Sequence, residues 1–519
     1  MAEVVAKRIR RQEAAIKQRS QWDNTYKDAM KFTAQHRETY DYHTPGEKKY
    51  DRIFDSTGLV SLMKFASNIQ SGLVPPFKKW AKLVPGAEIP EANREAAQKQ
   101  LNAITDTFFK YLHSSNFDTQ ISESFIDLGY GTGVMLLNEG DSDNPFNWTS
   151  VPLAEVSFFA GPFGKPQDVF RRIKMRKDNI KGTWAKAKLF KGTASADKKD
   201  ADEEIEVLES TCFNAATGKY DYYIDDIANE HQMYHEAMTR SPWIIFRWSV
   251  MPGEVYGRGP VLQALPDIKT LNKAAEILLQ SAALKSIPTF MAADDGVINP
   301  HNIEINVGTI IPCAAFGPGG PPIRALEVGG DVNLSQFVME KLQARIEDMM
   351  FTNPLGDVNL PVKSATEQSL RAQELANRIG SAFGRLHFEC VSEIFNGGLQ
   401  ILEKKGLLPV SLKDVKVDGK IIKLAYQSPL AQAQDEDEVI NSIRYVQTMQ
   451  QTVGPQFLPL FVDLDAFNVL ISDNMGVEKL RPTAEKRKEM VELITQMAQS
   501  QLMPPPTAPA PGAAPPPAQ

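Results

Sequence analysis

VLQALPDIKTLNKAAEILLQSAALKS (residues 261–286) and LSQFVMEKLQARIEDMMF (residues 334–351) are the two stretches that decide the architecture of this chain. In both, apolar residues recur at the helical spacing of three and four, opposite a stripe of polar residues. The polar stripes are Lys269, Lys273, Glu276 and Gln280 in the first stretch and Gln336, Glu340, Gln343 and Glu347 in the second. The apolar stripes are Ile268, Leu271, Ala275, Leu278, Leu279 and Ala282 in the first and Leu334, Val338, Leu342, Ile346, Met349 and Met350 in the second. We expect two amphipathic helices.

The segment between these helices, residues 287–333, is punctuated by Pro and Gly and contains three short strand-like runs, PTFMAADD, IEINVGTIIPCA and PIRALEVGG. After the second helix, the loop TNPLGDVNLPVK (residues 352–363) leads to a third helix that starts near Ser364. A helical hairpin with a small β-rich insertion at its tip suits a structural part that reaches away from a main body.

Bulk composition is that of an ordinary globular protein: 519 residues, 42% of them hydrophobic and 23% charged. The net charge of −7 gives no global basic field that would hold the chain on nucleic acid. Three widely spaced cysteines without a CxxC pair predict neither a disulfide framework nor a zinc site, and favour a reducing compartment. We find no apolar run of about 18 residues, as a membrane span requires, and no apolar core of a signal peptide near the N-terminus.

The remaining pattern predicts an α+β fold dominated by helices. In the first part of the chain, helices are expected within residues 1–45, from Ser56 or Thr57 to the stop at Pro75–Pro76, and as a pair over 91–127 that is broken near 114–116. In the last part, helices are expected over 365–405, at about 431–452 and at about 483–502. The 365–405 helix should stop at Gly406, with a bend allowed at Gly397 and Gly398. Strands are expected at GVMLLNE, VSFFAG, DVFRRIKM, IEVLEST, KYDYYID and WIIFRWSV, and a short one near VDGKIIKLAYQS. The tail, residues 504–519, is proline-rich and is expected to be polyproline-like or disordered.

FIDLGYGTGVMLL (residues 125–137) is the strongest candidate for a cofactor loop. Asp127 followed by Gly129, Gly131 and Gly133 resembles the nucleotide loop of S-adenosylmethionine-dependent methyltransferases. Such a loop follows a buried strand and opens a helix, whose N-terminus faces the ligand. Here the expected order is helix, turn, strand. We therefore favour a glycine-rich turn and keep the methyltransferase as the alternative.

Three other motifs allow both a functional and an ordinary interpretation. The cluster Lys7, Arg8, Arg10, Arg11 could bind DNA, but a solvated helix face with i,i+4 ion pairs is favoured. EHQMYHE (residues 230–236) could place His231 and His235 on one metal if helical, yet the segment could equally be a strand, and surface histidines are favoured. YGRGP (residues 256–260) lacks the GK[ST] of a P-loop, which favours a backbone bend before a helix. No catalytic residues, cofactor or metal are expected.

The ordered set of motifs resembles one family. RWSVMPGEVYGRGPVLQALPDIKTLN, then a helix, a small β-rich insertion, a helix and SATEQSLRAQEL, resembles the portal (head-to-tail connector) proteins of short-tailed, podovirus-type bacteriophages. FIDLGYGTGVMLL upstream and AYQSPLAQAQ downstream also resemble that family. The resemblance covers roughly residues 5–490 in order, and its specificity lies in the order of the motifs.

The resemblance implies a portal-type subunit: a non-enzymatic protein that forms a ring, usually a dodecamer, at one vertex of the virion capsid. Genome DNA is packaged and ejected through such a ring. The implied parts are a wing (1–260 and 364–430), a stem (261–286 and 334–351), a clip (287–333), a channel loop (352–363), a crown (431–503) and the tail (504–519). Other ring-forming virion scaffold proteins are a further alternative.

The implied partners are other copies of the chain, double-stranded DNA that slides past without sequence recognition, the terminase motor, the tail adaptor, and the major capsid and scaffolding proteins; no membrane is implied. An acidic chain suits a channel, because tight neutralisation of phosphates would act as a brake on sliding DNA. The DNA-channel candidates are Glu340, Lys341, Arg345, Glu347, Asn353, Asp357, Asn359 and Lys363. The candidates for docking at the clip are Asp294, Asp295, Pro312, Phe316 and Arg324. The pattern does not decide which helix faces line the channel.

Overall fold

The computed structural model describes residues 2–40, 53–86, 89–141, 143–184, 186–190, 204–286, 290–292, 323–325, 332–352, 380–409, 422–426, 442–454, 458–463, 467–468 and 471–472. It forms two compact units, Met1–Ala433 and Gln434–Gln519. In the second unit, residues 442–453 are helical and a short helix, α12, spans Leu458–Phe461. All other described elements belong to the first unit.

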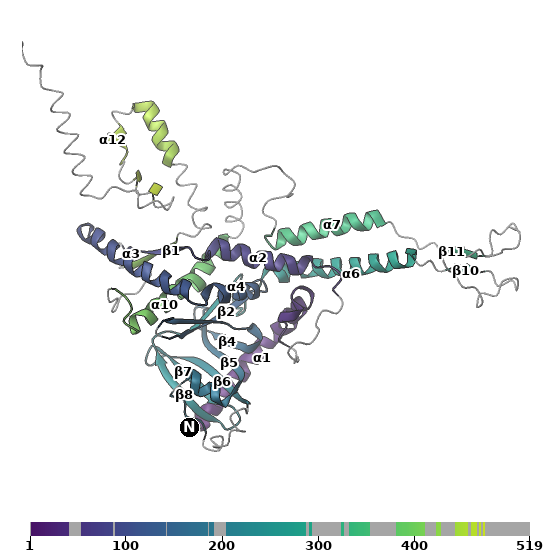
Figure 1. The fold of residues 1–519 in the computed structure, drawn as a ribbon, viewed down its shortest axis with the longest axis horizontal. Coiled ribbons are helices and arrows are strands. Elements are labelled where there is room, and N and C mark those ends of the chain that lie inside the picture. Colours follow the sequence, from purple (N-terminus) through teal and green to yellow (C-terminus); the bar gives the residue numbers. More distant parts are fainter. Residues whose placement is uncertain are drawn as a thin grey trace, which may run out of the picture. The chain divides into compact units, whose positions relative to one another are not determined.

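Helices of the first unit surround its sheets and also extend beyond them (Figure 1). They are α1 (Ala2–Thr33), α2 (Thr57–Leu73), α3 (Glu91–Ser114), α4 (Phe117–Leu128), α5 (Lys177–Thr183), α6 (Pro260–Ser286), α7 (Val332–Met349), α9 (Gly380–Leu386), a π-helical turn (His387–Val391) and α10 (Ser392–Lys404). Short 3₁₀ turns lie at Gln35–Arg37 and Leu153–Glu155. The helices expected from the hydrophobic periodicity over 57–74, 91–127, 261–286 and 334–351 are confirmed, within two residues at most ends.

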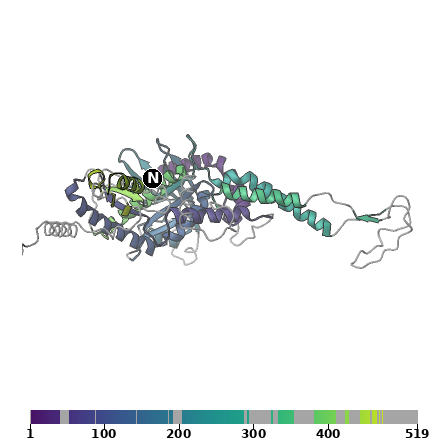
Figure 2. The ribbon, with the colours of Figure 1, turned by 90° about the horizontal axis from the view of Figure 1, so that it is seen from above.

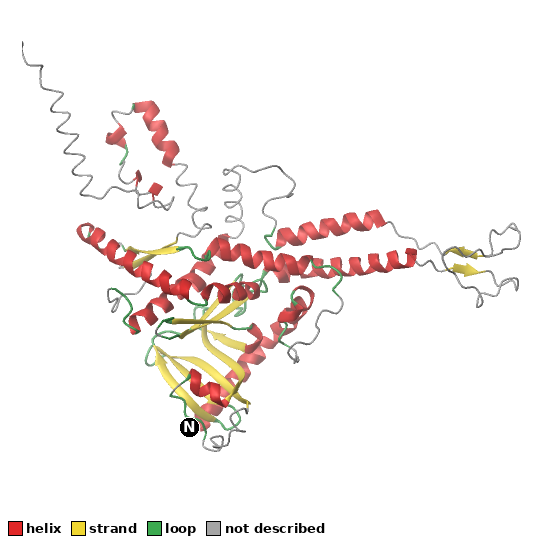
Figure 3. Ribbon diagram, in the orientation of Figure 1, coloured by secondary structure: helices red, strands yellow, loops and turns green. Residues whose placement is uncertain are grey.

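All described strand pairs are antiparallel (Figure 3). A five-stranded sheet has the order β4 (Val156–Ala160), β5 (Pro166–Arg176), β6 (Glu204–Asn214), β7 (Lys219–Asp226), β8 (His231–Met238). A three-stranded sheet places β2 (Thr132–Glu139) between β3 (Phe146–Ser150) and β9 (Trp243–Arg247). Two further pairs join β1 (Ala81–Pro85) to β12 (Ile422–Tyr426) and β10 (Phe290–Ala292) to β11 (Ile323–Ala325).

The strand predictions are confirmed for the six runs between 132 and 250 and for β12, and the 230–238 segment proves to be a strand. Two strands were not expected. β1 has no alternating pattern, and its partner β12 lies far away in sequence. β3 is a five-residue strand that pairs with β2 across the turn after Glu139. Of the three runs in the 287–333 insertion, the structure describes β10 and β11 within the first and third, and IEINVGTIIPCA lies outside the described residues.

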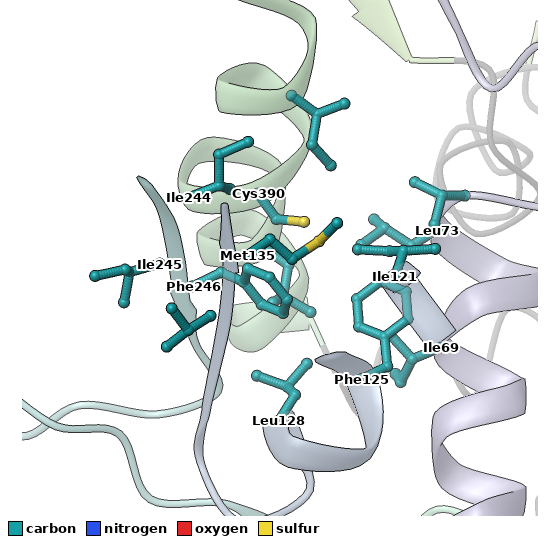
Figure 4. Close-up of a cluster of buried hydrophobic side chains, with 14 of the residues drawn as sticks. Ile69, Leu73, Ile121, Phe125, Leu128, Met135, Ile244, Ile245, Phe246 and Cys390 are labelled. Carbon is teal, nitrogen blue, oxygen red and sulfur yellow. The ribbon is translucent and has the colours of Figure 1, made fainter. Parts of the chain in front are cut away.

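The core of the first unit is built around β2, whose first six residues are all buried. Met135 of β2 lies between Phe125 of α4 on one side and Phe246 of β9 on the other (Figure 4). Cys390 of the π-helical turn lies nearby. A strand that is buried on both faces reads as a continuous apolar run, which is why its sequence, GVMLL, shows no alternation.

At the basic cluster of α1, the expectation of a solvated face is confirmed for Lys7, Arg10 and Arg11, which are exposed, and is wrong for Arg8. Arg8 is buried and donates two hydrogen bonds of 2.7 Å to the carboxylate of Asp225, while its guanidinium lies 3.9 Å from the centroid of the Tyr223 ring. Arg11 pairs with Asp168. Both acidic partners belong to the five-stranded sheet, so this part of α1 is attached by long-range ion pairs and not by the expected i,i+4 pairs. Because Arg8 is buried and paired with Asp225, it is not free to bind DNA.

Helix α10 continues through Gly397 and Gly398, the positions at which the sequence allowed a bend. A Cβ atom at Gly398 would lie 2.5 Å from Cε2 of Phe108, so this glycine lets α3 approach α10 closely. The irregularity lies earlier, in the π-helical turn, where Glu389 accepts hydrogen bonds from Arg247. The end of the helix before Gly406, which has φ +67°, is confirmed.

Helix α2 begins at Thr57, one of the two starts predicted from the sequence. Ser56 occupies the N-cap position without a side-chain cap hydrogen bond. The carboxylate of Asp55 instead accepts the N–H of Thr57 at 2.8 Å. An acceptor one residue earlier therefore satisfies one of the free N–H groups of the first turn.

The two glycine motifs meet, backbone against backbone, at the start of α6. Gly259 N donates to Tyr130 O at 2.9 Å and Val261 N donates to Gly129 O at 3.1 Å. A Cβ atom at Gly131, which has φ +139°, would lie 2.1 Å from the carbonyl oxygen of Gly257. Only glycine permits this approach. The crossing of residues 129–131 with 257–261 sets where α6 leaves the core, and both motifs are confirmed as turns.

We predict that Gly131→Ala lowers the free energy of unfolding by about 3 kcal/mol or more, because the methyl group meets backbone atoms and the residue keeps an unfavourable φ. Gly218→Ala is the matched control: its φ of +66° is also unfavourable, but nothing lies within 4 Å. It should cost only about 1 kcal/mol. Urea unfolding followed by circular dichroism measures both, and equal losses would show that the close crossing is not limiting.

Candidate functional site: the α6–α7 hairpin

Helices α6 and α7 lie side by side and extend away from the sheets (Figures 1 and 2). They contain 27 and 18 residues, which correspond to about 40 Å and 27 Å of helix at about 1.5 Å per residue. Pro266 lies inside α6, one and a half turns from its start. The hairpin thus offers a long surface, of which the described remainder of the first unit covers only the inner end.

The inner end of the hairpin is part of the main core. Ile268 and Leu271 of α6 and Ile346 of α7 are buried there, each at most 4% exposed. Asn272 lies among them and is buried too. Its side-chain oxygen accepts the backbone N–H of Phe54 at 2.7 Å, so the segment before α2 is attached to α6.

Polar contacts add a second layer around this inner end. Gln343 Nε2 donates to the carboxylate of Asp55 at 3.0 Å, and Asn68 Nδ2 donates to Phe351 O at 3.3 Å. Further ion pairs join Lys269 to Asp28, Arg345 to Asp267 and Lys64 to Glu347. These surface pairs fix the direction of the hairpin more than they stabilise it, because exposed ion pairs contribute little.

The outer half of the hairpin exposes apolar side chains. Ile277 and Leu279 of α6 are 52% and 57% exposed, and Phe337 and Val338 of α7 are 53% and 46% exposed. The apolar stripes expected from the sequence are therefore buried only at their inner ends. At about 100° per residue, Ile277 and Leu279 point roughly 160° apart around α6, so the exposed apolar side chains lie on more than one face of the hairpin. Large exposed apolar side chains of this kind are typical of contacts with other molecules.

Of the DNA-channel candidates, the structure describes four. Glu340 and Lys341 are exposed, and Lys341 Nζ lies 4.3 Å from the centroid of the Phe337 ring. Arg345 and Glu347 are engaged in the ion pairs with Asp267 and Lys64. Asn353, Asp357, Asn359 and Lys363 lie outside the described residues. That these residues line a channel stays a prediction.

The candidates for docking at the clip are mostly outside the described part of the chain. Arg324 is in β11 and pairs in register with Met291 of β10. Asp294, Asp295, Pro312 and Phe316 are not among the described residues. Their role in docking stays a prediction.

The glycine-rich loop after α4 has no room for a nucleotide. Residues 257–259 occupy the space against Gly129 and Gly131, and the order is helix, turn, strand. Asp127, the acidic residue of the motif, is buried and bonded to Arg37 at 3.1 Å. Burial raises the pKa of this carboxyl to about 6 although Arg37 opposes the shift. The methyltransferase alternative has no support.

The paired histidines lie on β8 and do not converge on a common ligand. His235 stacks on Tyr223 with ring centroids 4.6 Å apart and its Nε2 lies 3.1 Å from the Asp221 carboxylate. A ring nitrogen of His231 lies 3.1 Å from Lys188 O. Within the described ranges, no group of three or more His, Cys, Asp or Glu residues could hold a metal ion.

None of the described helices combines the length and hydropathy that a membrane crossing requires.

Comparison with known proteins identifies the family. The family model for the bacteriophage head to tail connecting protein matches residues 6–480. The chain belongs to this family. The chain is 24% identical over 455 residues to the probable portal protein of Bordetella phage BPP-1, covering 83% of this chain and 80% of that protein. It is 21% identical over 515 residues to the portal protein of Salmonella phage epsilon15, covering 88% and 85%.

Among solved structures, this chain is similar to a chain in the neck of an empty gene transfer agent particle. The two are 12% identical, with a TM-score of 0.37 over 80% of this chain and 89% of that chain.

Sequence reasoning missed the residues that hold the hairpin in place. Asn272 was not singled out, although it is a polar residue on the apolar face of the 261–286 stretch. That position was the available signal, since a polar side chain on a buried face must find a hydrogen-bond partner. Its partners, the backbone N–H groups of Phe54 and Asp55, lie more than 200 positions away and give no pattern.

A pH-dependent prediction follows from Asp127. Because its folded-state pKa is raised, the folded state binds a proton between about pH 4 and pH 6 that the unfolded state has released. This carboxyl therefore makes stability fall as pH rises through that window, by on the order of 2–3 kcal/mol. In Asp127→Asn, this component of the fall should be absent.

Denaturant unfolding at intervals from pH 4 to pH 7 measures the difference. Glu123→Gln is the control, because it also removes a carboxylate bonded to Arg37 but from an exposed position. Its pH profile should keep most of the fall, because burial is the main cause of the raised Asp127 pKa and the charge of Glu123 is the smallest one. An unchanged profile for Asp127→Asn would contradict the assignment of the raised pKa.

Proposed function

We propose that this chain is the portal subunit of a phage particle. Copies of it form a ring at one capsid vertex, and the DNA genome enters and leaves through the centre of the ring. The observation that carries the proposal is the α6–α7 hairpin, whose outer half exposes four large apolar side chains in a member of the head to tail connecting family. A monomer that is built to work alone does not present such a surface.

Ring formation accounts for that surface. A contact between different faces of identical subunits closes into a ring when its rotation permits. In a ring around an axis parallel to the hairpins, each hairpin lies between two others. Phe337 and Val338 of one subunit and Ile277 and Leu279 of a neighbour then lose their exposure to water, which stabilises the assembly.

The parts of the subunit follow from this arrangement. The hairpin (261–286 and 334–351) is the stem, 287–333 is the clip, 352–363 is the channel loop, 1–260 with 364–430 is the wing and 431–503 is the crown. The clip docks the terminase motor during packaging and the tail adaptor afterwards. The wing contacts the capsid and scaffolding proteins. The terminase supplies ATP hydrolysis, and the subunit itself is not an enzyme.

The channel is lined by the acidic part of the stem. Glu340 is exposed on α7 and is the best placed of the described candidates, with Lys341 beside it. Arg345 and Glu347 are already paired within the subunit, so they contribute less net charge. Repeated carboxylates repel the DNA backbone, and weak repulsion lets the duplex slide.

Negative-stain electron microscopy of the purified chain tests the ring. We expect closed rings with a central hole for the unmodified chain and loss of rings for the double variant Phe337→Glu, Val338→Glu, because two charges would have to be buried between subunits. Met251→Glu, at another exposed apolar residue in a loop, is the control and should form rings. A stable monomer at micromolar concentration in the unmodified chain would contradict the proposal.

Packaging of DNA tests the channel. Glu340→Lys replaces a negative charge by a positive one on the proposed inner surface, a change of +2 in net charge per subunit. We therefore expect intact rings but packaging or ejection slowed at least about tenfold, with a stronger effect at low salt. Glu13→Lys makes the same charge change on an exposed position of α1 and should leave both rates unchanged. Equal rates for the two variants would remove Glu340 from the channel.

A further inference from the structure

Phe77 combines an unfavourable backbone conformation with an exposed aromatic side chain, which the folding of the subunit alone does not explain. It is the third residue of a turn from Pro75 to Lys78, closed by a hydrogen bond of 3.4 Å from Lys78 N to Pro75 O. Its φ is +58°, in the left-handed region that glycine or asparagine normally occupies at this turn position. The side chain is 79% exposed, so the strain is not compensated by burial within the subunit.

The turn that presents Phe77 is held firmly. The ring of His113 lies with its centroid 6.0 Å from that of Phe77, and a nitrogen of the same ring lies 3.1 Å from Lys78 O. His113 in turn stacks on the buried Phe109. A strained residue with a fixed and exposed ring is typical of a site that is arranged in advance for a contact.

Two lysines follow Phe77. Lys79 forms an ion pair with Asp106. Among the described residues, Lys78 forms no ion pair, and its side chain is exposed. The projection formed by Phe77 and Lys78, which we call the Phe77 knob, thus offers one aromatic ring and one positive charge.

A pocket of about 270 Å³ lies between β2, β8 and α10. Its inner wall includes the buried residues Leu137, Ile244 and Ile401. Its rim carries the partly exposed carboxylates of Glu139, Glu236 and Glu393. Lys404 bonds to the first two carboxylates and Arg240 to the third, so the rim retains one negative charge in excess. This α10 pocket suits an aromatic ring accompanied by a cation.

The knob and the α10 pocket lie on opposite sides of α10. Phe77, His113, Phe109 and Phe395 of α10 form a chain of ring contacts on one side. The α10 residues that line the pocket are 393, 397, 400, 401 and 404. At about 100° per residue they point roughly 140–240° away from Phe395. Two different and complementary features on opposite sides of α10 allow a contact between unlike faces of neighbouring copies, which is the kind that closes into a ring.

We propose that the Phe77 knob of one copy inserts into the α10 pocket of the next copy. The inference rests on the proposed ring, to which it adds a contact outside the stem. The Phe77 ring lies against the apolar inner wall, and the Lys78 ammonium lies at the acidic rim. The contact explains both the exposed strained aromatic residue and the charge excess at the pocket.

Replacing Phe77 by glycine separates this role from a structural one. Glycine adopts a φ of +58° without strain, so Phe77→Gly should leave the thermal midpoint of the isolated subunit unchanged or raise it. The same variant should raise the subunit concentration at half-assembly about tenfold or more, because it removes one buried aromatic ring per contact. Phe163→Gly is the matched control, because Phe163 is 93% exposed and the structure gives it no positive φ. Unchanged assembly of Phe77→Gly would overturn the inference.

Disulfide trapping tests the juxtaposition itself in the full chain. The double variant Lys78→Cys, Gln400→Cys is made in a chain whose three native cysteines are replaced by serine. Mild oxidation should then give a ladder of covalent multimers on a denaturing gel, whereas each single variant should give none. Rings that assemble without the ladder, or a disulfide formed within one chain, would overturn the knob contact while leaving the proposed function intact. Absence of rings in the unmodified chain would instead remove the proposed function itself, and with it the contact.

Discussion

The crossing of two glycine-containing backbone segments is the constraint on which the rest of the first unit depends. Residues 129–131 and 257–261 lie in direct contact, joined by hydrogen bonds from Gly259 N and Val261 N. The hydroxyl of Tyr26 donates to Gly257 O at 2.6 Å, and Gly257 N donates to Thr132 Oγ1 at 2.9 Å. This crossing therefore brings together α1, the turn after α4, the start of β2 and the start of α6. A side chain at the crossing would push the hairpin away from the core.

Beyond that crossing, the two ends of the α6–α7 hairpin differ in how much apolar surface they bury within the subunit. The inner end is stabilised as an ordinary core is, by buried Ile268, Leu271 and Ile346 and by the hydrogen bonds of Asn272. The outer half buries little and exposes apolar residues. The inner end of the hairpin is therefore stable within one subunit, whereas the apolar side chains of the outer half can be buried only by neighbouring copies. This agrees with the ring that we propose.

The Phe77 knob and the α10 pocket are further surfaces, outside the hairpin, that a neighbouring copy can cover. Both are features that the isolated subunit leaves incomplete, one by exposing a strained aromatic ring and the other by leaving an apolar wall beneath an acidic rim. A second contact, away from the stem, would resist tilting of one subunit against the next. A conduit through which DNA moves under force needs that resistance.

The sequence by itself determined the local structure: the two striped helices, the helix-turn-strand order around Gly131, the stop at Gly406 and, through the order of its motifs, the family. These depend on periodicity and turn chemistry, which act over a few residues. Tertiary structure alone decided what pairs over long distances. Examples are the burial of Arg8 against Asp225, β1 against β12, Asn272 against the segment before α2, and the fit of α10 to α3 at Gly398. The physical reason is that a side chain's charge or size is visible in the sequence, whereas the group it meets depends on how remote segments pack.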